Sequence, residues 1–222
     1  MKKVISLMLV MILMVSGLFI LTGCDNGGET SGEGSSKQEA KKDVVEISYE
    51  LGKGTITLSV PKKEDGTPKY EFTKEKPENM TLSGTFYLST DTANFAIGTS
   101  GLAYNTGKEY KEKYGETQAT FDGYLDFVND ETMSSRPKLA GWEQMDINGR
   151  KAVRYYSRSG SSGEYTYYGY SYRVGVDDIY PGSGLDMAVI YNKAKEELPK
   201  ESQEFDQEVL DIINSLKVVA NQ

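Results

Sequence analysis

Histidine is absent from the 222 residues, and cysteine occurs only once. Without histidine, the chain cannot build a histidine-based catalytic triad, a histidine-ligated zinc site or the commonest general base near neutral pH. A single cysteine cannot form an internal disulfide. An enzyme made from this sequence would have to rely on carboxylates, lysine, tyrosine or serine. The composition therefore favours a non-enzymatic protein with neither a cofactor nor a metal centre.

Positive charge is also scarce. The 25 basic residues are outnumbered by 33 acidic ones, so the formal net charge is −8, and the sequence has no basic tract. Neutralisation of phosphates supplies most of the affinity of proteins for nucleic acids. We therefore expect no nucleic-acid partner.

A long hydrophobic run occurs only at the N-terminus. Lys2 and Lys3 precede an almost wholly apolar stretch, Val4 to Leu21, in the order that is typical of a secretory signal. A run of about 18 apolar residues is also close to the minimum length of a membrane-spanning helix, so an uncleaved anchor is the alternative. Both interpretations place the rest of the chain outside the plasma membrane.

The end of this run decides between them. Its last residues resemble the lipobox of bacterial lipoproteins: Leu21, Thr22, Gly23 and Cys24. The resemblance implies that residues 1–23 are removed as a signal peptide and that a diacylglyceryl group is joined to the cysteine sulfur. Two acyl chains on one residue suffice for stable anchoring, so the lipid bilayer is an expected partner. A lipidated Cys24 is not available for thiol catalysis or metal binding.

The rest of the chain divides into a linker and a domain. Residues 24–43 comprise the lipidated cysteine and a predicted flexible linker, because they are rich in Gly, Ser and Glu and lack aromatic residues. Residues 44–222 are long enough for a single domain with its own core. Lysine supplies 20 of the 25 basic residues, a bias that we take to indicate an AT-rich Gram-positive genome. The expected location is thus the outer face of the cell membrane.

Hydrophobic periodicity predicts that strands dominate this domain. Alternating runs predict strands within residues 44–51, 55–60, 80–90, 93–99, 142–158, 164–176 and 185–192. Asn148 and Gly149 lie between two such runs, which is a strong signal for a hairpin turn. Apolar residues at helical spacing predict helices within residues 118–131 and 205–216. The expected fold class is α+β, an antiparallel sheet flanked by helices with the C-terminal helix packed on the sheet.

Four segments resemble landmarks of the PsbP-like fold: TITLSVPK, INGRKAVRYY, LDMAVIYN and FDQEVLDIINSLKV. The last of them, which ends the C-terminal helix at Ser215, Leu216 and Lys217, is the most similar. The resemblance implies an α/β/α sandwich. It supplies no catalytic residue, because the superfamily consists largely of binding and assembly factors.

The most unusual segment is residues 150–173, which holds seven tyrosines and four of the five arginines in the chain. A symmetric hairpin with its loop at residues 159–164 would place Tyr155 opposite Tyr168 on one surface. The other surface then becomes a candidate binding face, made of Arg154, Tyr156, Arg158, Tyr165, Tyr167 and Arg173. Such a face could stack on sugars, capture a carboxylate or phosphate, or form a protein interface. The alternative is a purely structural face, because tyrosine suits strands and arginine stems pack over it.

Three groups of aspartates could suggest a cation site. Asp122, Asp126 and Asp130 recur every four residues, but carboxylates in a row on one helix do not converge as the ligands of a calcium loop do. Residues 146–150 are similar to the start of a calcium loop but hold a single aspartate, and residues 177–186 hold three aspartates; turn-forming residues explain both patterns. We interpret all three groups as structural.

These observations favour a membrane-anchored extracytoplasmic lipoprotein that acts as a non-enzymatic binding or assembly accessory factor of the cell envelope. Its partner would be an envelope protein or a glycan. Two alternatives stay open. A carboxylate-dependent hydrolase of envelope glycans would need two carboxylates about 5–10 Å apart, one of them with a raised pKa. A ligand-capturing subunit for a transporter usually needs two lobes and a hinge, whereas this chain has room for one domain.

Overall fold

A computed structural model of the chain describes residues 43–102, 112, 120–132, 139–160, 166–194 and 204–222. They all belong to one compact unit, residues 41–222. The predictions for the N-terminus fall outside the described residues: the signal peptide 1–23 with its lipobox, the lipidated Cys24, and the linker as far as residue 42. Tyr165 of the candidate binding face also lies outside them.

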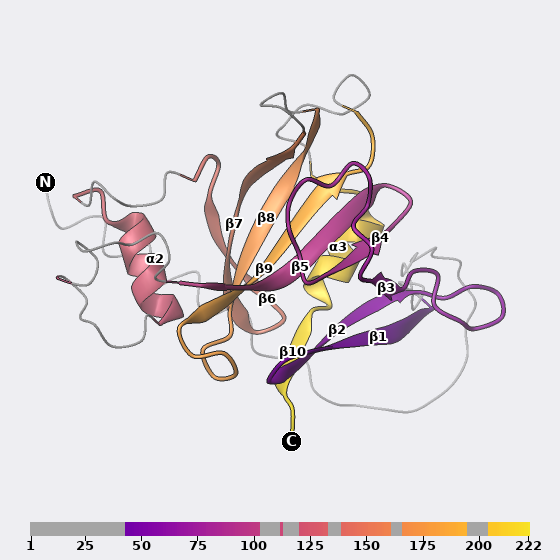
Figure 1. Ribbon diagram of the computed structural model, residues 1–222, viewed down its shortest axis with the longest axis horizontal. Coiled ribbons are helices and arrows are strands. Elements are labelled where there is room, and N and C mark those ends of the chain that lie inside the picture. Colours follow the sequence, from indigo (N-terminus) through magenta and orange to yellow (C-terminus); the bar gives the residue numbers. More distant parts are fainter. Residues whose placement is uncertain (1–42, 103–111, 113–119, 133–138, 161–165, 195–203) are drawn as a thin grey trace, which may run out of the picture. The chain divides into compact units, whose positions relative to one another are not determined.

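Seven strands form the larger sheet, in the order β3-β4-β5-β9-β8-β7-β6 (Figure 1). Every neighbouring pair is antiparallel. The bounds are β3 (Phe72–Thr73), β4 (Phe86–Ser89), β5 (Ala93–Gly101), β6 (Glu143–Ile147), β7 (Arg150–Ser159), β8 (Tyr167–Gly175) and β9 (Ser183–Tyr191). The β6–β7 turn has positive φ at Asn148 (49°) and Gly149 (81°), as a tight two-residue hairpin requires. The predicted Asn-Gly turn is confirmed.

A smaller sheet joins the beginning of the domain to its end. It contains β1 (Val44–Leu51), β2 (Gly54–Pro61) and β10 (Lys217–Ala220), with β2 in the middle. Both neighbours run antiparallel to β2, with Ile47 opposite Leu58 and Val218 opposite Ile56. The C-terminus of the chain therefore completes a sheet that its first strands begin.

Two helices have described bounds, α2 (Phe121–Asn129) and α3 (Gln207–Asn214). Each begins at a side-chain cap: Thr120 accepts a hydrogen bond from Gly123 N, and Asp206 accepts one from Val209 N. These caps satisfy amide groups that the first helical turn leaves unpaired. Neither helix is long and apolar enough to cross a bilayer.

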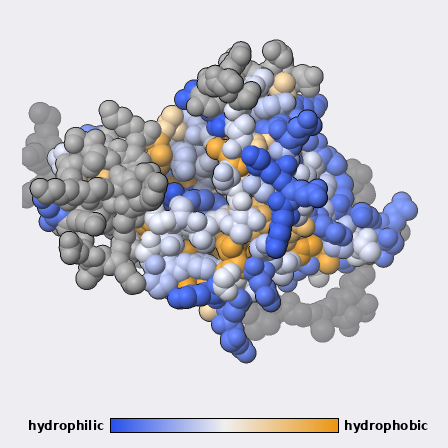
Figure 2. Space-filling view, viewed as in Figure 1, coloured by the Kyte–Doolittle hydropathy of each residue, from blue (hydrophilic) through white to orange (hydrophobic). Residues whose placement is uncertain are grey.

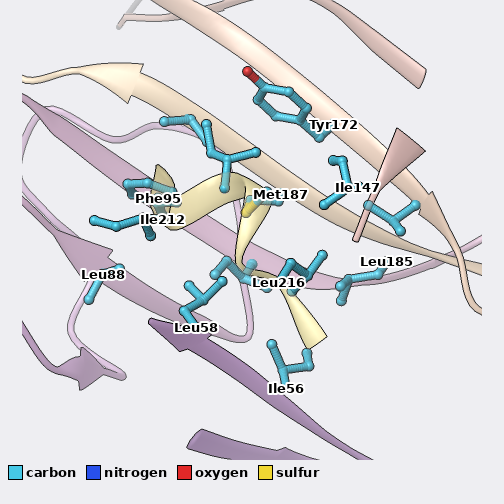
Figure 3. Close-up of a cluster of buried hydrophobic side chains, with 14 of the residues drawn as sticks. Ile56, Leu58, Leu88, Phe95, Ile147, Tyr172, Leu185, Met187, Ile212 and Leu216 are labelled. Atoms are coloured by element: carbon cyan, nitrogen blue, oxygen red, sulfur yellow. The ribbon is translucent and has the colours of Figure 1, made fainter. Parts of the chain in front are cut away.

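The two faces of the larger sheet are covered by different elements. Ala152 and Val153 are neighbours on β7, so their side chains point to opposite faces. Ala152 belongs to the main core, which includes α3 and the smaller sheet, whereas Val153 packs in the cluster of α2. Figure 3 shows Ile212 of α3 among the buried side chains of the main core. A fully buried side chain of this kind contributes about 1.5–3 kcal/mol through the hydrophobic effect.

Strands provide most of the regular structure, in two antiparallel sheets with two short helices. The predicted strands, their antiparallel arrangement and the two helical regions are confirmed, although the run 80–90 yields only the four residues of β4. The prediction of one sheet is wrong, because β1 and β2 pair with β10 and not with the other seven strands. The sequence analysis did not predict β10.

Candidate functional site on the tyrosine-rich hairpin

Strands β7 and β8 form the tyrosine-rich hairpin, but not in the predicted register. Tyr155 lies opposite Ser171 and not Tyr168, a shift of three residues. An odd shift reverses which side chains of the two strands share a face. The predicted candidate face is therefore wrong as a set and is divided between the two surfaces. Arg154, Tyr156 and Arg158 lie on the α3 side of the sheet, and Tyr167 and Arg173 lie on the opposite side.

Arg173 is part of a largely buried ion pair. Its Nε donates to Asp186 Oδ1 at 2.7 Å, and its Nη2 donates to Asp186 Oδ2 at 3.1 Å and to Ser100 Oγ at 2.9 Å. The guanidinium lies 5.1 Å from the ring centre of Tyr124 on α2. Burial alone would lower the pKa of Arg173, but the hydrogen bonds and the charge of Asp186 outweigh it and raise the pKa. Arg173 therefore ties β8 to β9 under α2.

Arg154 lies on the other face and is held by two carboxylates. Its Nη1 donates to both carboxylate oxygens of Glu204, at 2.7 and 2.6 Å, and its Nη2 donates to Glu143 Oε2 at 2.7 Å. The guanidinium lies 4.7 Å from the ring centre of Tyr170. Burial acts to lower the pKa of Arg154, but the hydrogen bonds to Glu204 and Glu143 outweigh it and raise the pKa.

Four aromatic rings form a row beside Arg154. The ring centres of Tyr156 and Tyr170 are 5.4 Å apart, those of Tyr170 and Phe205 are 5.5 Å apart, and those of Phe205 and Tyr191 are 4.7 Å apart. Phe205 directly precedes the cap of α3, so the row joins the hairpin to that helix. Ring pairs at these distances add about 0.5–1.5 kcal/mol each beyond the area that they bury.

A buried hydroxyl lies close to this row. Tyr172 is 1% exposed, and in Figure 3 its oxygen points away from the apolar side chains of the core. Burial raises the pKa of Tyr172. Within the described residues, neither its hydroxyl nor Arg154 Nε has a hydrogen-bond partner. The charge of Arg154 acts to lower the pKa of this hydroxyl, but burial is the larger effect.

A hollow of about 160 Å³ opens where the row reaches the surface. It is lined by Ala140, Tyr156, Ser157, Arg158, Tyr168 and Gly169. Tyr156 is 39% exposed, which makes it one of three large hydrophobic residues that are well exposed among those described. Its ring is held by Gly141, whose φ is +60° and where a Cβ would lie 2.2 Å from Tyr156 Cε2. The hollow is therefore lined by two tyrosines and one arginine, and Gly141 packs against one of the tyrosine rings.

The aspartates of the three sequence patterns have structural contacts. Asp122 pairs with Lys151 at 2.7 Å, and Asp146 accepts a hydrogen bond from Gly149 N in the β6–β7 turn. In the third pattern, Asp177 accepts a hydrogen bond from the first amide of α2 at 2.6 Å. Among the described residues, no group of three or more potential metal ligands is present.

Sequence reasoning missed four residues of the site. Tyr168 and Tyr170 were assigned to the other surface because the register was shifted. Glu143 was not considered, although it lies directly opposite Arg154 in the β6–β7 pair. Glu204 lies 50 residues from Arg154 along the chain, and no local sequence pattern links the two.

No protein-family model matches this chain, and no curated protein sequence matches it either. The site must therefore be interpreted from its own geometry.

Proposed function

We propose that this chain is a lipid-anchored extracytoplasmic binding or assembly accessory factor of the cell envelope, and that it uses the hollow beside Tyr156. The lipobox sequence at residues 21–24 supports the anchor and the location. The proposal also assigns the domain to the PsbP-like α/β/α sandwich, because a helix packs on each face of its larger sheet. Most of the binding and assembly factors with that fold act without catalysis.

The observation that carries the binding role is the exposure of Tyr156 in a hollow that Arg158 and Tyr168 also line. Tyrosine and arginine are the residues most enriched where proteins contact partners, since each offers a large apolar surface and a polar end. A volume of about 160 Å³ is smaller than that of ordinary small-molecule sites. The hollow therefore suits one side chain or one sugar ring of a larger partner.

The hydrolase alternative has less support. It requires a carboxyl group with a raised pKa next to a second carboxylate. The carboxyl pKa values that clearly shift in the described part of the chain belong to Asp65, Asp91 and Asp178, and each of them is lowered by hydrogen bonds. Two further carboxylates, Glu143 and Glu204, are both engaged by Arg154.

The anchor is tested by cell fractionation of the wild type and Cys24→Ala, with mass spectrometry of the N-terminal peptide. We expect the wild type in the membrane fraction with a diacylglyceryl group on Cys24. We expect the variant to lack the lipid and to be retained only through an uncleaved signal. A wild-type protein without the lipid would contradict the proposal.

The binding role is tested by photo-crosslinking in intact cells, with the crosslinker at Ala140 on the rim of the hollow. We expect a discrete envelope partner whose yield falls when Tyr156→Ala and Arg158→Ala are combined. The matched control combines Lys74→Ala and Glu75→Ala, which are exposed elsewhere. An unchanged yield in the hollow variant, with its fold verified, would remove the hollow from the function. Capture of a transporter subunit would favour the alternative of a ligand-capturing subunit.

A further inference from the structure

The edges of the two sheets differ in how they are protected. Unpaired edges attract other strands, and proteins usually shorten, charge or cover them. Strand β3 has two residues, and β6 has five. Strand β10 has four residues. Its Val218 carbonyl accepts a hydrogen bond from Arg150, and the carbonyl of Leu216, just before the strand, accepts one from Asn148, at 3.0 Å each. These three edges are short or covered.

Strand β1 is different. It has eight residues and contains no proline, glycine or lysine. Lys62 N donates to Asp43 O at 3.1 Å, so the facing residues 43 and 62 are hydrogen-bonded. In an antiparallel ladder every second pair of facing residues is hydrogen-bonded. In this ladder the odd-numbered residues of β1 bond to β2, so the backbone groups of residues 44, 46, 48 and 50 point away from it. In the described part of the chain, no other strand pairs with this edge. Figure 1 shows β1 as the outer strand of the smaller sheet.

The outer surface of the smaller sheet exposes apolar side chains. Two of the three well-exposed large hydrophobic residues among those described lie on it, Val44 at 42% on β1 and Val219 at 57% on the opposite edge strand, β10. Elsewhere, on the side drawn in Figure 2, hydrophobic residues reach the surface only in small separate areas. A hollow of about 210 Å³ begins at Val44 and is lined by Asp43, Val44, Ser59, Pro61, Glu208, Asp211 and Ile212. Its lining combines an apolar part with three carboxylates, of which Asp43 pairs with Lys62 and Glu208 with Lys69.

The charges of β1 determine which strand can pair with it. Glu46 and Glu50 lie on the exposed face of the edge, and Glu46 also pairs with Lys217 of β10 while its side chain stays 54% exposed. Antiparallel pairing with β1 of a second copy, centred on Ser48, would place Glu46 opposite Glu50, and parallel pairing in register would place each glutamate beside its copy. Like charges directly opposite one another destabilise a strand pair. These two self-pairings are therefore disfavoured, whereas a partner strand with positive charges suits either direction of pairing.

We propose that the free edge of β1 binds an extended basic segment of another protein by strand addition. The segment carries lysine or arginine four residues apart, opposite Glu46 and Glu50, and a further side chain enters the acidic hollow at Val44. Backbone hydrogen bonds at residues 44–50 supply the affinity, and the glutamates supply the choice of partner. The acidic net charge of −8 favours the approach of such a segment. This surface is separate from the hollow beside Tyr156 and does not depend on its function.

The test uses the full-length protein in detergent and a ten-residue peptide of threonine and valine with two lysines four residues apart. A control peptide, the glutamate peptide, carries glutamates in place of the lysines. Amide hydrogen exchange is measured residue by residue. We expect the lysine peptide to slow exchange of the amides at residues 44, 46, 48 and 50 by about tenfold or more, with the amides that face β2 unchanged and the glutamate peptide inactive.

Two substitutions at one position isolate the edge. Proline at an outward-facing position of an edge strand removes a donor to the partner and leaves the ladder to β2 intact. Ser48→Pro should lower the affinity for the lysine peptide about tenfold, which is the contribution of one good hydrogen bond. Ser48→Ala should bind the peptide with the affinity of the wild type. Equal binding to Ser48→Pro, or equal binding of the two peptides, would overturn the proposal.

A second variant covers the case in which Ser48→Pro does not fold. Replacing Glu46 and Glu50 together by lysine should abolish binding of the lysine peptide and allow the glutamate peptide to bind. Unchanged preference would refute the assigned partner. Protection of the β1 amides without peptide, rising with protein concentration, would show self-pairing and would also refute it.

Discussion

The two faces of the β7–β8 hairpin each carry an arginine that meets carboxylates and a tyrosine ring, but in different settings. Arg173 has one carboxylate partner, Asp186, and lies beneath α2, with its side chain 15% exposed. Arg154 has two partners, Glu143 and Glu204, whose side chains are 59% and 48% exposed. The two arginine side chains are similarly buried, since that of Arg154 is 17% exposed. The difference lies in their partners, because the carboxylates of Arg154 are at the surface.

This difference separates what holds the fold from what can meet a partner. A largely buried charge with one counter-charge is intolerant of change, because its partner cannot be replaced by water. A charge with two exposed counter-charges tolerates the loss of either one. The same residue types therefore have a structural role on one face and are available for recognition on the other.

The largest effect is expected from Asp186→Ala. This substitution leaves the Arg173 guanidinium in a largely buried position without its carboxylate, and we expect the free energy of unfolding to fall by about 3 kcal/mol. Urea unfolding followed by circular dichroism measures the change. A loss below about 1 kcal/mol would show that Arg173 reaches solvent and that the contrast between the two faces is false.

Gly141→Ala should have the next largest effect, on the α3 face. The new Cβ would lie 2.2 Å from the ring of Tyr156, and φ is +60°. We expect a loss of about 2 kcal/mol and a displaced Tyr156 ring, seen as a change in near-ultraviolet circular dichroism. Gly149→Ala is the matched control, because φ is +81° and a Cβ there meets nothing within 4 Å. Equal losses in the two variants would show that the ring contact is unimportant.

The aromatic row should give a smaller, pH-dependent effect through Tyr191. Burial, followed by the nearby Tyr170 and Glu204, raises the pKa of Tyr191 from 10.0 to about 12. Because the folded pKa is the higher one, the unfolded chain loses this proton first, so the stabilisation is complete below pH 10 and is lost as the pH rises towards 12. Tyr191→Phe has no proton to lose. Between about pH 9 and about pH 11 it should lose about 1 kcal/mol less free energy of unfolding than the wild type, after allowance for partial exposure. Parallel curves for the two proteins would contradict this.

The smallest effect is expected from Glu204→Ala. Arg154 keeps Glu143 at 2.7 Å, and both carboxylates are substantially exposed, so the loss should be about 0.5 kcal/mol. A double-mutant cycle with Glu143→Ala tests whether the two carboxylates substitute for each other. We expect the double variant to lose more than the sum of the single losses. Strict additivity would show that they act independently.

Local sequence patterns predicted the elements of the fold well. The alternation in β1 and β2, the Asn148-Gly149 turn and the helical spacing of Val209, Ile212 and Ile213 are all properties of neighbouring residues, and each produced the expected element. These elements bury one face each, so the pattern of apolar residues reports them directly.

Long-range pairing could not be predicted in the same way. The four residues of β10 are too short to be recognised, and their partner Ile56 is far away in the sequence. The hairpin register was inferred from an assumed symmetric loop, and a shift of three residues exchanged the positions of Tyr167 and Tyr168 between the two faces. Half of the candidate site was consequently placed on the wrong surface. Tyrosine occurs on both faces of β8, so composition alone could not reveal the error.

The closure of the smaller sheet has a consequence for the order of folding. Ser59 N on β2 donates to Ser215 Oγ, 156 residues further along the chain, and β10 follows immediately afterwards. Contacts between residues so distant in sequence raise the contact order and slow folding. During synthesis from the N-terminus, β2 is one of the first strands made, yet one of its edges stays unpaired until the last few residues appear. The apolar residues Ile56, Leu58 and Val60, which are buried in the folded domain, lack part of their cover for that interval, so this strand is open to aggregation while the chain is being made.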